Sequence, residues 1–561
     1  MLGPKKIDFL QLKLSCFLIC CSILFFIYTN ESIKAQGLNK NIPSQVRIDS
    51  RFKTLLSADE DIVSPQSLPD RPALPDSFLS ANRHFMIHYT TSGNDAIAVT
   101  DSNKNFIPDR IEKIANAFEK SYEVEIEQFA YPLPPSFEGG SKSYDIYIVD
   151  LINLYAVTVT EDLDSTAWEQ KNVSSYILFD NDFNGPGFYF QGDNAIKTIA
   201  AHEFFHAIQL GYVFRKEDGY FFEMTAVWME DQVFDEIDNY LYYLDYFFAT
   251  PDVPLIAVSY TIPGIFKHIY GSCIFAFYIA ENFGSQAIRQ VWELMQDHTA
   301  IEAINIVLTK HGSNFESEFV KFSMWNFFTG GRARPSFSYK DSKIYPEIPV
   351  AKNTLIDYYH QHDGDGYFLT AGYFVFHPVE TANYKAMLYT DYPENWRLGV
   401  VIYDEHSIRT FFSKAGKSFK LEDVLPDQNI AVIPCNVDRF ANPSYVYLKH
   451  KPEPFTFILQ REIKSIPSNK KPFQVHCIHP NPFTGAVTFT IKCIVETSLS
   501  IRIFNVTGQQ VDRIIIDQLS IDLNKVTWHA SDSDQHLPSG VYFCQFCAGK
   551  FTETKKLLLC R

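Results

Sequence analysis

Residues 194–210 read NAIKTIAAHEFFHAIQL, and this stretch decides the fold class of the longest part of the chain. Ile196, Ala200 and Phe204 recur at helical spacing, so we expect a helix with one face turned toward a core. His202 and His206 are four residues apart and share the opposite face of that helix. The pattern predicts a helix that presents two imidazoles to one ion. The alternative is a surface helix with two solvated histidines.

Glu203 follows the first histidine directly and completes an HExxH pattern. Zinc lowers the pKa of water bound to it to about 7, which makes that water a usable nucleophile. A carboxylate next to a histidine ligand can take up the proton that this water releases. We therefore predict zinc at His202 and His206, with Glu203 as the general base of a hydrolysis.

A catalytic zinc site has three protein ligands and one open position. A third histidine is absent just downstream, where residues 209–212 read QLGY. Residues 221–231 read FFEMTAVWMED, a second helix on which Glu223 and Glu230 share a face. Glu223 is the favoured third ligand because it needs the shorter connection, and Glu230 remains the alternative.

Taken together, the two helical motifs resemble the gluzincin class of metallopeptidases and, more closely, a family of secreted bacterial metalloproteases. The similarity extends over roughly residues 80–345, through FMIHYTTSG at 85–93, NFIPD at 105–109, YDIY at 144–147 and WNFFTGGR at 325–332. The resemblance implies that Glu223 is the third zinc ligand. It also implies that Tyr270 or His268 donates a hydrogen bond to the tetrahedral oxyanion. Unlike thermolysin, the chain has no Asp four residues after Glu223, so the residue that orients the histidines is not identified.

A second ion site, for calcium, is one interpretation of residues 101–112. Oxygen donors stand at positions 1, 3, 5, 9 and 12 of a calcium-loop pattern: Asp101, Asn103, Asn105, Asp109 and Glu112. Position 6 is Phe106 rather than the glycine that the sharp turn of such a loop requires. The equal alternative is an Asx-rich turn that caps a helix beginning near Asp109.

Composition and periodicity indicate a globular chain of several domains. Hydrophobic residues make up 46% of the 561 residues, and the formal net charge of −17 argues against a nucleic-acid partner. Helical patterns run over residues 109–125, 194–210, 221–236, 268–283 and 284–297. Beyond about residue 335, short alternating runs with turn signals favour a β-sandwich.

The first 35 residues are typical of a secretory signal peptide. Lys5 and Lys6 precede an apolar run from Leu14 to Thr29, and Ala35 offers a small residue for cleavage. This run is shorter than the ~20 residues of a bilayer span, although an uncleaved anchor is the alternative. No later stretch is long and apolar enough to span a membrane, so we expect an exported chain without a membrane span.

The last 85 or so residues, 476–561, resemble the C-terminal sorting domain of the bacterial type IX secretion system. The resemblance rests on HPNPF at 479–483, LSIRIFNVTGQQV at 499–511 and LPSGVYF at 537–543. Alternating strands with turns between them are typical of a small β-sandwich. The implied partner is the type IX secretion machinery, and the alternative is a generic immunoglobulin-like binding module.

The expected organisation is a signal peptide (1–35), a linker or short pro-segment (36–76), an α+β zincin-like metallopeptidase domain (77–335), a β-sandwich domain (336–465) and an immunoglobulin-like sorting domain (476–561). The expected function is a zinc-dependent endopeptidase that acts on protein or peptide substrates after export through the periplasm. A catalytically silent adhesion or binding protein built on the same shell is the alternative. The intact Glu203 favours an active enzyme.

Overall fold

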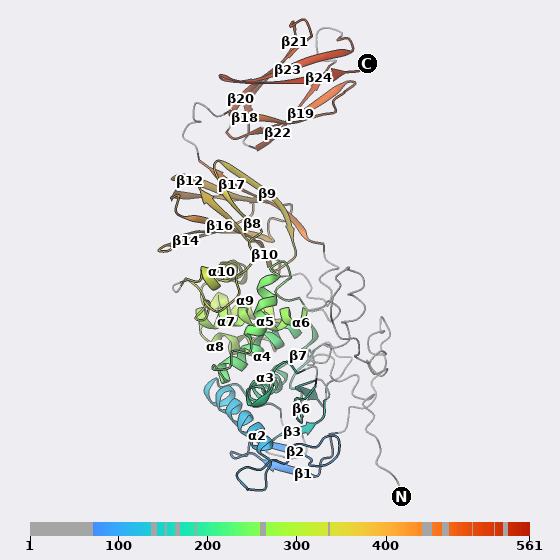
Figure 1. Ribbon diagram of the computed structural model, residues 1–561, viewed down its shortest axis with the longest axis vertical. Helices are drawn as coiled ribbons and strands as arrows, with labels where there is room; N and C mark the ends of the chain where they lie inside the picture. The colour runs from blue at the N-terminus through green and yellow to red at the C-terminus, as the bar shows by residue number, and fades with distance from the viewer. Residues whose placement is uncertain are drawn as a thin grey trace.

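The computed structural model describes residues 71–560, except for 136–142, 152–153, 162, 164–168, 186–187, 258–264, 335–336, 440–450, 463–470, 496, 521 and 531–536. The expected signal peptide and most of the expected linker lie outside the described residues. Figure 1 shows three bodies in a row along the long axis: a mixed α/β body, a β-sandwich and a second β-body at the C-terminus.

A five-stranded sheet lies at the N-terminal end of the molecule, with strand order β1-β2-β3-β6-β4. The strands are β1 (Asp76–Leu79), β2 (Phe85–Tyr89), β3 (Tyr144–Val149), β4 (Ala156–Thr160) and β6 (Ser175–Asp180). β2, β3 and β6 are parallel, and β1 and β4 run antiparallel at the two edges. Strand β6 reads SYILFD and is buried at every position. Ile177 and Phe179 belong to the large core, and Tyr176 and Leu178 belong to a smaller cluster on the other face of the sheet.

The end of the expected linker belongs to this body. The Arg71 guanidinium pairs with Glu161 at 2.6 Å and also with Asp145, and β1 begins at Asp76. Residues 71–76 therefore pack on the sheet, and the first body begins earlier than residue 77.

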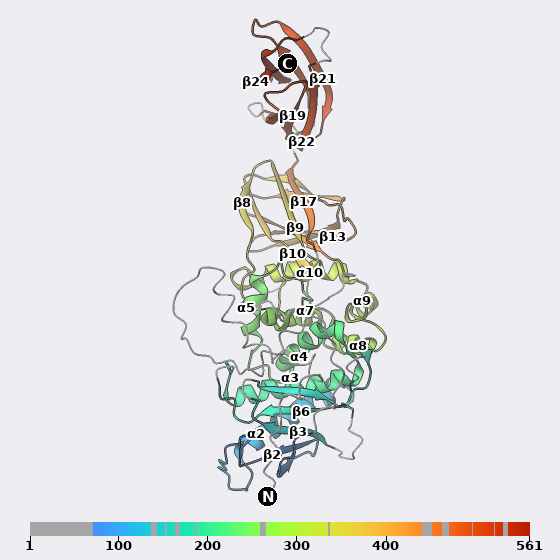
Figure 2. The same cartoon turned by 90° about the vertical axis from the view of Figure 1, so that its right-hand side faces the viewer.

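Helices pack against one face of the sheet and against one another (Figure 2). They are α2 (Asp109–Tyr122), a π-helical segment η4 (Glu123–Gln128), α3 (Gly192–Tyr212), α4 (Gly219–Val233), α5 (Leu241–Ala249), α6 (Ile265–Gly271), α7 (Cys273–Phe283), α8 (Gln286–Leu294), α9 (Ala300–Lys310) and α10 (Phe315–Phe327). Phe204 of α3 meets the ring of Phe85 edge-on at 5.0 Å, which fixes α3 against β2. A short antiparallel ribbon pairs β5 (Glu169–Gln170), which precedes α3 in the sequence, with β7 (Phe214–Arg215), which follows it.

Several helix boundaries differ from the sequence-based expectation, and two of the differences have a visible local basis. The helical pattern over 268–283 is split, because α6 ends at Gly271 and α7 begins at Cys273. Helix α3 continues past Gly211 to Tyr212, and Gly211 does not have the positive φ of a helix-ending glycine.

The middle body is a β-sandwich of two sheets, with orders β14-β13-β16-β11-β8 and β15-β12-β17-β9. Its strands are β8 (Lys352–Ile356), β9 (Tyr359–Gly366), β10 (Thr370–Ala371), β11 (Phe374–Pro378), β12 (Ala382–Tyr389), β13 (Trp396–Tyr403), β14 (Ile408–Lys414), β15 (Ser418–Val424), β16 (Asn429–Asn436) and β17 (Glu453–Arg461). Inward side chains such as Trp396, Leu398 and Phe457 fill the space between the sheets.

The hydrophobic core of the α/β body continues into this sandwich. Helix α10 lies against β13, and a Cβ on Gly399 would come within 2.9 Å of the Met324 terminal methyl carbon, so the helix sits close to the strand. Tyr373 donates its hydroxyl hydrogen bond to the carbonyl of Ser323 at 3.1 Å. One cluster of buried side chains therefore spans both bodies.

The C-terminal body has a core of its own, between sheets of order β18-β19-β22 and β21-β20-β23-β24. Its strands are β18 (Phe473–His479), β19 (Ala486–Cys493), β20 (Thr497–Phe504), β21 (Gln510–Leu519), β22 (Asp522–His529), β23 (Gly540–Ala548) and β24 (Phe551–Leu559). The molecule is thus a multidomain α+β protein with two β-sandwich-like bodies. Within the described part of the chain, no helix combines the length and apolar character of a membrane span.

Candidate metal centre

His202 and His206 project from the middle of α3, and both rings are buried: His202 is 6% exposed and His206 is fully buried. Their Nε2 atoms are 3.0 Å apart. The alternative interpretation, a surface helix with two solvated histidines, is therefore wrong. Two imidazoles held this close inside a protein need a shared proton or a shared cation.

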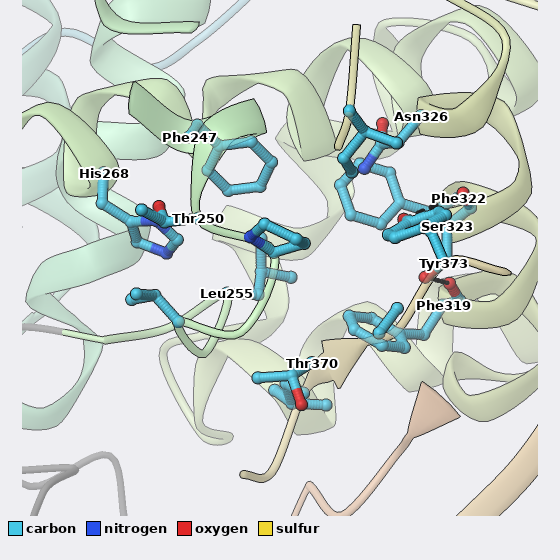
Figure 3. Close-up of a pocket in the computed structure, with 15 residues that line it drawn as sticks. Phe247, Thr250, Leu255, His268, Phe319, Phe322, Ser323, Asn326, Thr370 and Tyr373 are labelled. Atoms are coloured by element: carbon cyan, nitrogen blue, oxygen red, sulfur yellow. Dashed lines mark hydrogen bonds between the residues drawn. The ribbon is translucent and has the colours of Figure 1, made fainter. Parts of the chain in front are cut away.

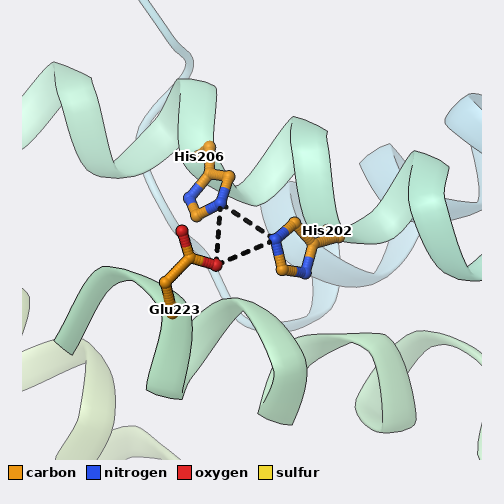
Figure 4. A group of neighbouring side chains, drawn as sticks. All are labelled: His202, His206 and Glu223. Carbon is orange, nitrogen blue, oxygen red and sulfur yellow. Dashed lines mark hydrogen bonds and ion pairs between the residues drawn. The ribbon is translucent and has the colours of Figure 1, made fainter. Parts of the chain in front are cut away.

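Helix α4 returns antiparallel to α3 and brings Glu223 to the two rings (Figure 4). Glu223 Oε2 lies 3.3 Å from His202 Nε2 and 3.7 Å from His206 Nε2. All three side chains offer ligand atoms within 4.8 Å of one another, and in the described part of the chain they form the one such group. Tetrahedral zinc with ligand atoms at 2.0–2.1 Å places those atoms about 3.3 Å apart. The three side chains fit such an ion without rearrangement.

Each histidine is held by a hydrogen bond at its other ring nitrogen. His202 Nδ1 donates to Glu230 Oε1 at 2.7 Å, and His206 Nδ1 donates to Gln209 Oε1 at 2.7 Å. Gln209 is oriented in turn because its amide donates to Thr225 Oγ1 at 3.0 Å. Both Nε2 lone pairs are thus directed at the centre, as metal-binding histidines require.

The sequence alone does not show this arrangement. It offers Glu230 only as an alternative ligand and identifies no orienting residue, although seven residues are about two helical turns and keep Glu230 on the face of Glu223. In the sequence, Gln209 shows only that no third histidine follows His206 directly.

The charges of the centre are strongly coupled. Burial lowers the pKa of His202, but the carboxylates of Glu223 and Glu230 outweigh it and raise that pKa well above the usual range. Burial opposes ionisation of Glu223, yet His206 and His202 lower its pKa to about 2. For Glu230, burial raises the pKa and His202 offsets only part of the rise. A cation that replaces the proton on His202 would meet an ionised carboxylate already in place.

Glu203 is buried at 3% exposure, and its carboxylate is held by strand β4. Thr158 Oγ1 donates to Glu203 Oε2 at 2.8 Å and contacts the Glu203 carbonyl oxygen at 2.9 Å. Thr158 was not singled out from the sequence, because only the packing of α3 on the edge strand brings the two residues together.

The two candidates for the oxyanion donor lie in different surroundings. The ring centre of Tyr270 is 6.0 Å from that of His202. His268 instead stacks on Phe247 at 4.9 Å, donates to the carbonyl of Pro254 at 2.9 Å and lines a cavity of about 30 Å³ (Figure 3). Of the two, Tyr270 is placed beside the metal ligands.

The five oxygen-bearing residues of the expected calcium loop bond mainly to loop groups. Asp101 accepts hydrogen bonds from the backbone of Asn105 and Phe106, and Asp109 accepts from Ser102. The amides of Asn103 and Asn105 both donate to Glu112. These bonds form an Asx-rich turn ahead of α2, but no side chain caps the helix, whose N-cap is Pro108. The calcium interpretation remains a prediction.

Two sequence families match the chain. Residues 77–327 match a family of unknown function (DUF6055), and residues 477–559 match the secretion system C-terminal sorting domain. The sorting domain makes this a secreted or cell-surface protein. The other match names no activity and no metal, so the resemblance to secreted metalloproteases stays a prediction.

No curated protein matches the chain. Among solved structures, a mitogen derived from Yersinia pseudotuberculosis is 9% identical, with a TM-score of 0.16 and coverage of 20% of this chain and 94% of that chain. A β-glucuronidase of Faecalibacterium prausnitzii is 10% identical, with a TM-score of 0.13 and coverage of 36% of each chain. At these scores the likenesses carry no argument about fold or function.

Proposed function

We propose that the chain is a secreted zinc-dependent endopeptidase. The observation that carries the proposal is the buried triangle of His202 Nε2, His206 Nε2 and Glu223 Oε2, with Glu203 next to the first ligand on the same helix. Two imidazoles and one carboxylate are a ligand set of catalytic zinc sites. Calcium and magnesium favour sites built from oxygen ligands instead.

Each residue then has a definite task. Zinc, when bound, would acidify a water molecule and polarise the scissile carbonyl. Thr158 holds Oε2 of Glu203, which leaves Oε1 to take up a proton and later deliver it to the leaving amine. Tyr270 is the group that would donate a hydrogen bond to the oxyanion.

The test is cleavage of a mixed peptide library by the purified chain from residue 36 onward, with and without a chelator. We expect cleavage that the chelator abolishes and that added zinc restores. Glu203→Gln should keep zinc yet lower kcat by about 10²–10⁴-fold, because an amide cannot accept the proton. Glu127→Gln, an exposed carboxylate of η4, is the matched control and should cleave like the wild type.

Absence of cleavage by the zinc-loaded wild type would contradict the proposal. In that case the alternative function, a catalytically silent binding protein, would be favoured. Equal cleavage by the Glu203→Gln chain would leave a peptidase whose general base is another residue.

A further inference from the structure

Four tyrosines form a continuous row of ring contacts that begins at the candidate metal centre. Tyr270 lies next to His202 and stacks on Tyr243 with ring centres 4.9 Å apart. Tyr243 meets Tyr242 edge-on at 5.4 Å, and Tyr242 stacks on Tyr189 at 4.4 Å. We call these four residues the tyrosine row.

Exposure rises along the tyrosine row from the centre outward. Tyr270 and Tyr243 are each 8% exposed, whereas Tyr242 is 36% and Tyr189 is 47% exposed. Large aromatic side chains left open to solvent in a stacked pair are a feature of binding surfaces rather than of ordinary surface. The row therefore leads from the buried metal ligands to solvent.

A hydrogen bond ties the outer end of the row to its inner part. The hydroxyls of Tyr189 and Tyr243 are 2.5 Å apart, and Tyr243 stacks on Tyr270 beside His202. A ring fixed in this way loses little conformational entropy when a ligand stacks on it.

The chemistry of the exposed pair favours an aromatic ligand. The Lys267 ammonium lies 3.9 Å from the ring centre of Tyr242. Tyr189 stacks on the Tyr242 ring, the Lys267 ammonium lies over the same ring, and the Tyr189 hydroxyl is paired with that of Tyr243. The exposed ring edges of Tyr242 and Tyr189 are therefore what this pair offers to a ligand. Aromatic side chains pack edge-to-face against such rings and gain from the contact beyond the area that they bury.

We propose that Tyr189 and Tyr242 form a specificity subsite for an aromatic residue of the peptide substrate, close to the scissile bond. This inference rests on the proposed function, because it assigns the row to the substrate of the same centre. The continuous contacts from Tyr242 through Tyr243 and Tyr270 to His202 place the subsite a few side chains from the metal ligands.

The experiment compares the zinc-loaded chain from residue 36 onward with three variants on peptide pairs that differ by Phe or Ala at each position flanking the cleaved bond. Tyr242→Ala should raise KM about tenfold for the Phe peptides and change the Ala peptides by less than about twofold, with kcat and zinc content unchanged. Tyr242→Phe keeps the ring and should behave as the wild type. Tyr392→Ala removes a tyrosine of the β-sandwich that is 46% exposed, and it is the matched control.

Binding of a labelled Phe peptide to the Glu203→Gln chain separates the two proposals. Cleavage without a Phe preference, or with a preference that Tyr242→Ala leaves intact, overturns the subsite and leaves the peptidase standing. No cleavage by the wild type, together with Phe-peptide binding that Tyr242→Ala weakens about tenfold, overturns the peptidase and supports the subsite as a peptide-binding surface. Neither cleavage nor peptide binding overturns both.

Discussion

The two nitrogens of the His202 ring have opposite roles. Nε2 points into the triangle with His206 and Glu223, whereas Nδ1 donates to Glu230. A histidine that donates through Nδ1 to a carboxylate keeps its Nε2 lone pair fixed in direction and more basic. The orienting carboxylate of Glu230 therefore belongs to the candidate metal centre although it is not one of the proposed ligands.

Glu230→Gln tests this role. Its amide can still accept from Nδ1 through the oxygen but no longer carries charge, so metal affinity should fall by about 10–100-fold while one ion per chain remains at saturation. Competition with a calibrated chelator measures the affinity.

Glu223→Gln is the comparison. Loss of a proposed ligand should lower the metal affinity more than loss of the hydrogen-bond partner of a ligand. If Glu230→Gln abolishes metal binding and Glu223→Gln retains it, the two glutamates have been assigned the wrong way round.

His268 gives a prediction about pH. It is fully buried against Phe247, its Nδ1 has no partner among the described residues, and burial lowers its pKa from 6.5 to about 4. The unfolded chain therefore takes up a proton first as the pH falls through 6.5. Stability is complete above pH 6.5 and decreases down to pH 4, by up to about 3 kcal/mol.

Denaturant unfolding at a series of pH values measures this contribution. His268→Gln keeps a donor for the Pro254 carbonyl and does not titrate, so its stability should depend less on pH between 6.5 and 4. Parallel curves for the wild type and the variant would rule the assignment out.

At the scale of elements, α5 and α6 decide where Tyr270 lies. Gly271 follows Tyr270, and a Cβ there would come within 2.7 Å of Phe247 Cβ and 2.8 Å of the Tyr243 carbonyl oxygen. The missing side chain lets the two helices touch, and this contact stacks Tyr243 on Tyr270.

Gly271→Ala should therefore separate α5 from α6. We expect a loss of about 1–3 kcal/mol in the free energy of unfolding, the usual range for overpacking, together with lower peptide cleavage because Tyr270 moves. Gly219→Ala is the control, since a Cβ at Gly219 meets nothing within 4 Å. Equal stability of the two variants would show that the helices tolerate the separation.

The sequence predicts the long helices well and their interruptions poorly. The patterns over 194–210 and 221–236 correspond to α3 and α4, because each has a continuous buried face. The break between α6 and α7 escapes detection, since the 268–283 stretch remains apolar on both sides of it. The π-helical segment η4 likewise continues the apolar pattern of α2 without a visible mark.

The HExxH residues could be predicted from the sequence, whereas the residues that contact and orient them could not. His202, Glu203 and His206 share one helix, so their spacing alone fixes their relation. Thr158 and the tyrosine row come from other elements, and tertiary packing decides which of their side chains reach the centre.

At the scale of the whole molecule, the buried side chains form one core shared by the α/β body and the β-sandwich and a separate core in the C-terminal body, whereas the sequence predicts three separate domains. The cluster that contains the metal centre extends into the sandwich through Tyr373, Val401 and Ile433. The C-terminal body is held by a separate cluster, and Lys492 touches the sandwich through a cation–π contact with Tyr359 at 4.8 Å.

Two truncations test this division. A chain that ends near residue 465 should keep its fold, its zinc and its peptidase activity, because it retains the whole shared core. A chain that ends at residue 335 should unfold or aggregate, because it exposes the face of α10 that covers β13. Unfolding cooperativity and soluble yield measure both.

In its host, the chain that ends near residue 465 should remain in the periplasm, since it has lost the sorting domain at 477–559. Normal export of that chain would show that the signal for export lies elsewhere. A folded and active chain ending at residue 335 would show that the sandwich is a separate domain.

The most direct test of the central claim is a zinc titration of the metal-free chain from residue 36 onward, with peptide cleavage followed at each addition. We predict that cleavage returns in proportion to added zinc and reaches its plateau at about one equivalent. The chain with both His202→Ala and His206→Ala should show no return. Stoichiometric zinc binding by the wild type without any cleavage, or a plateau that the double variant reproduces, would contradict a zinc peptidase centred on these histidines.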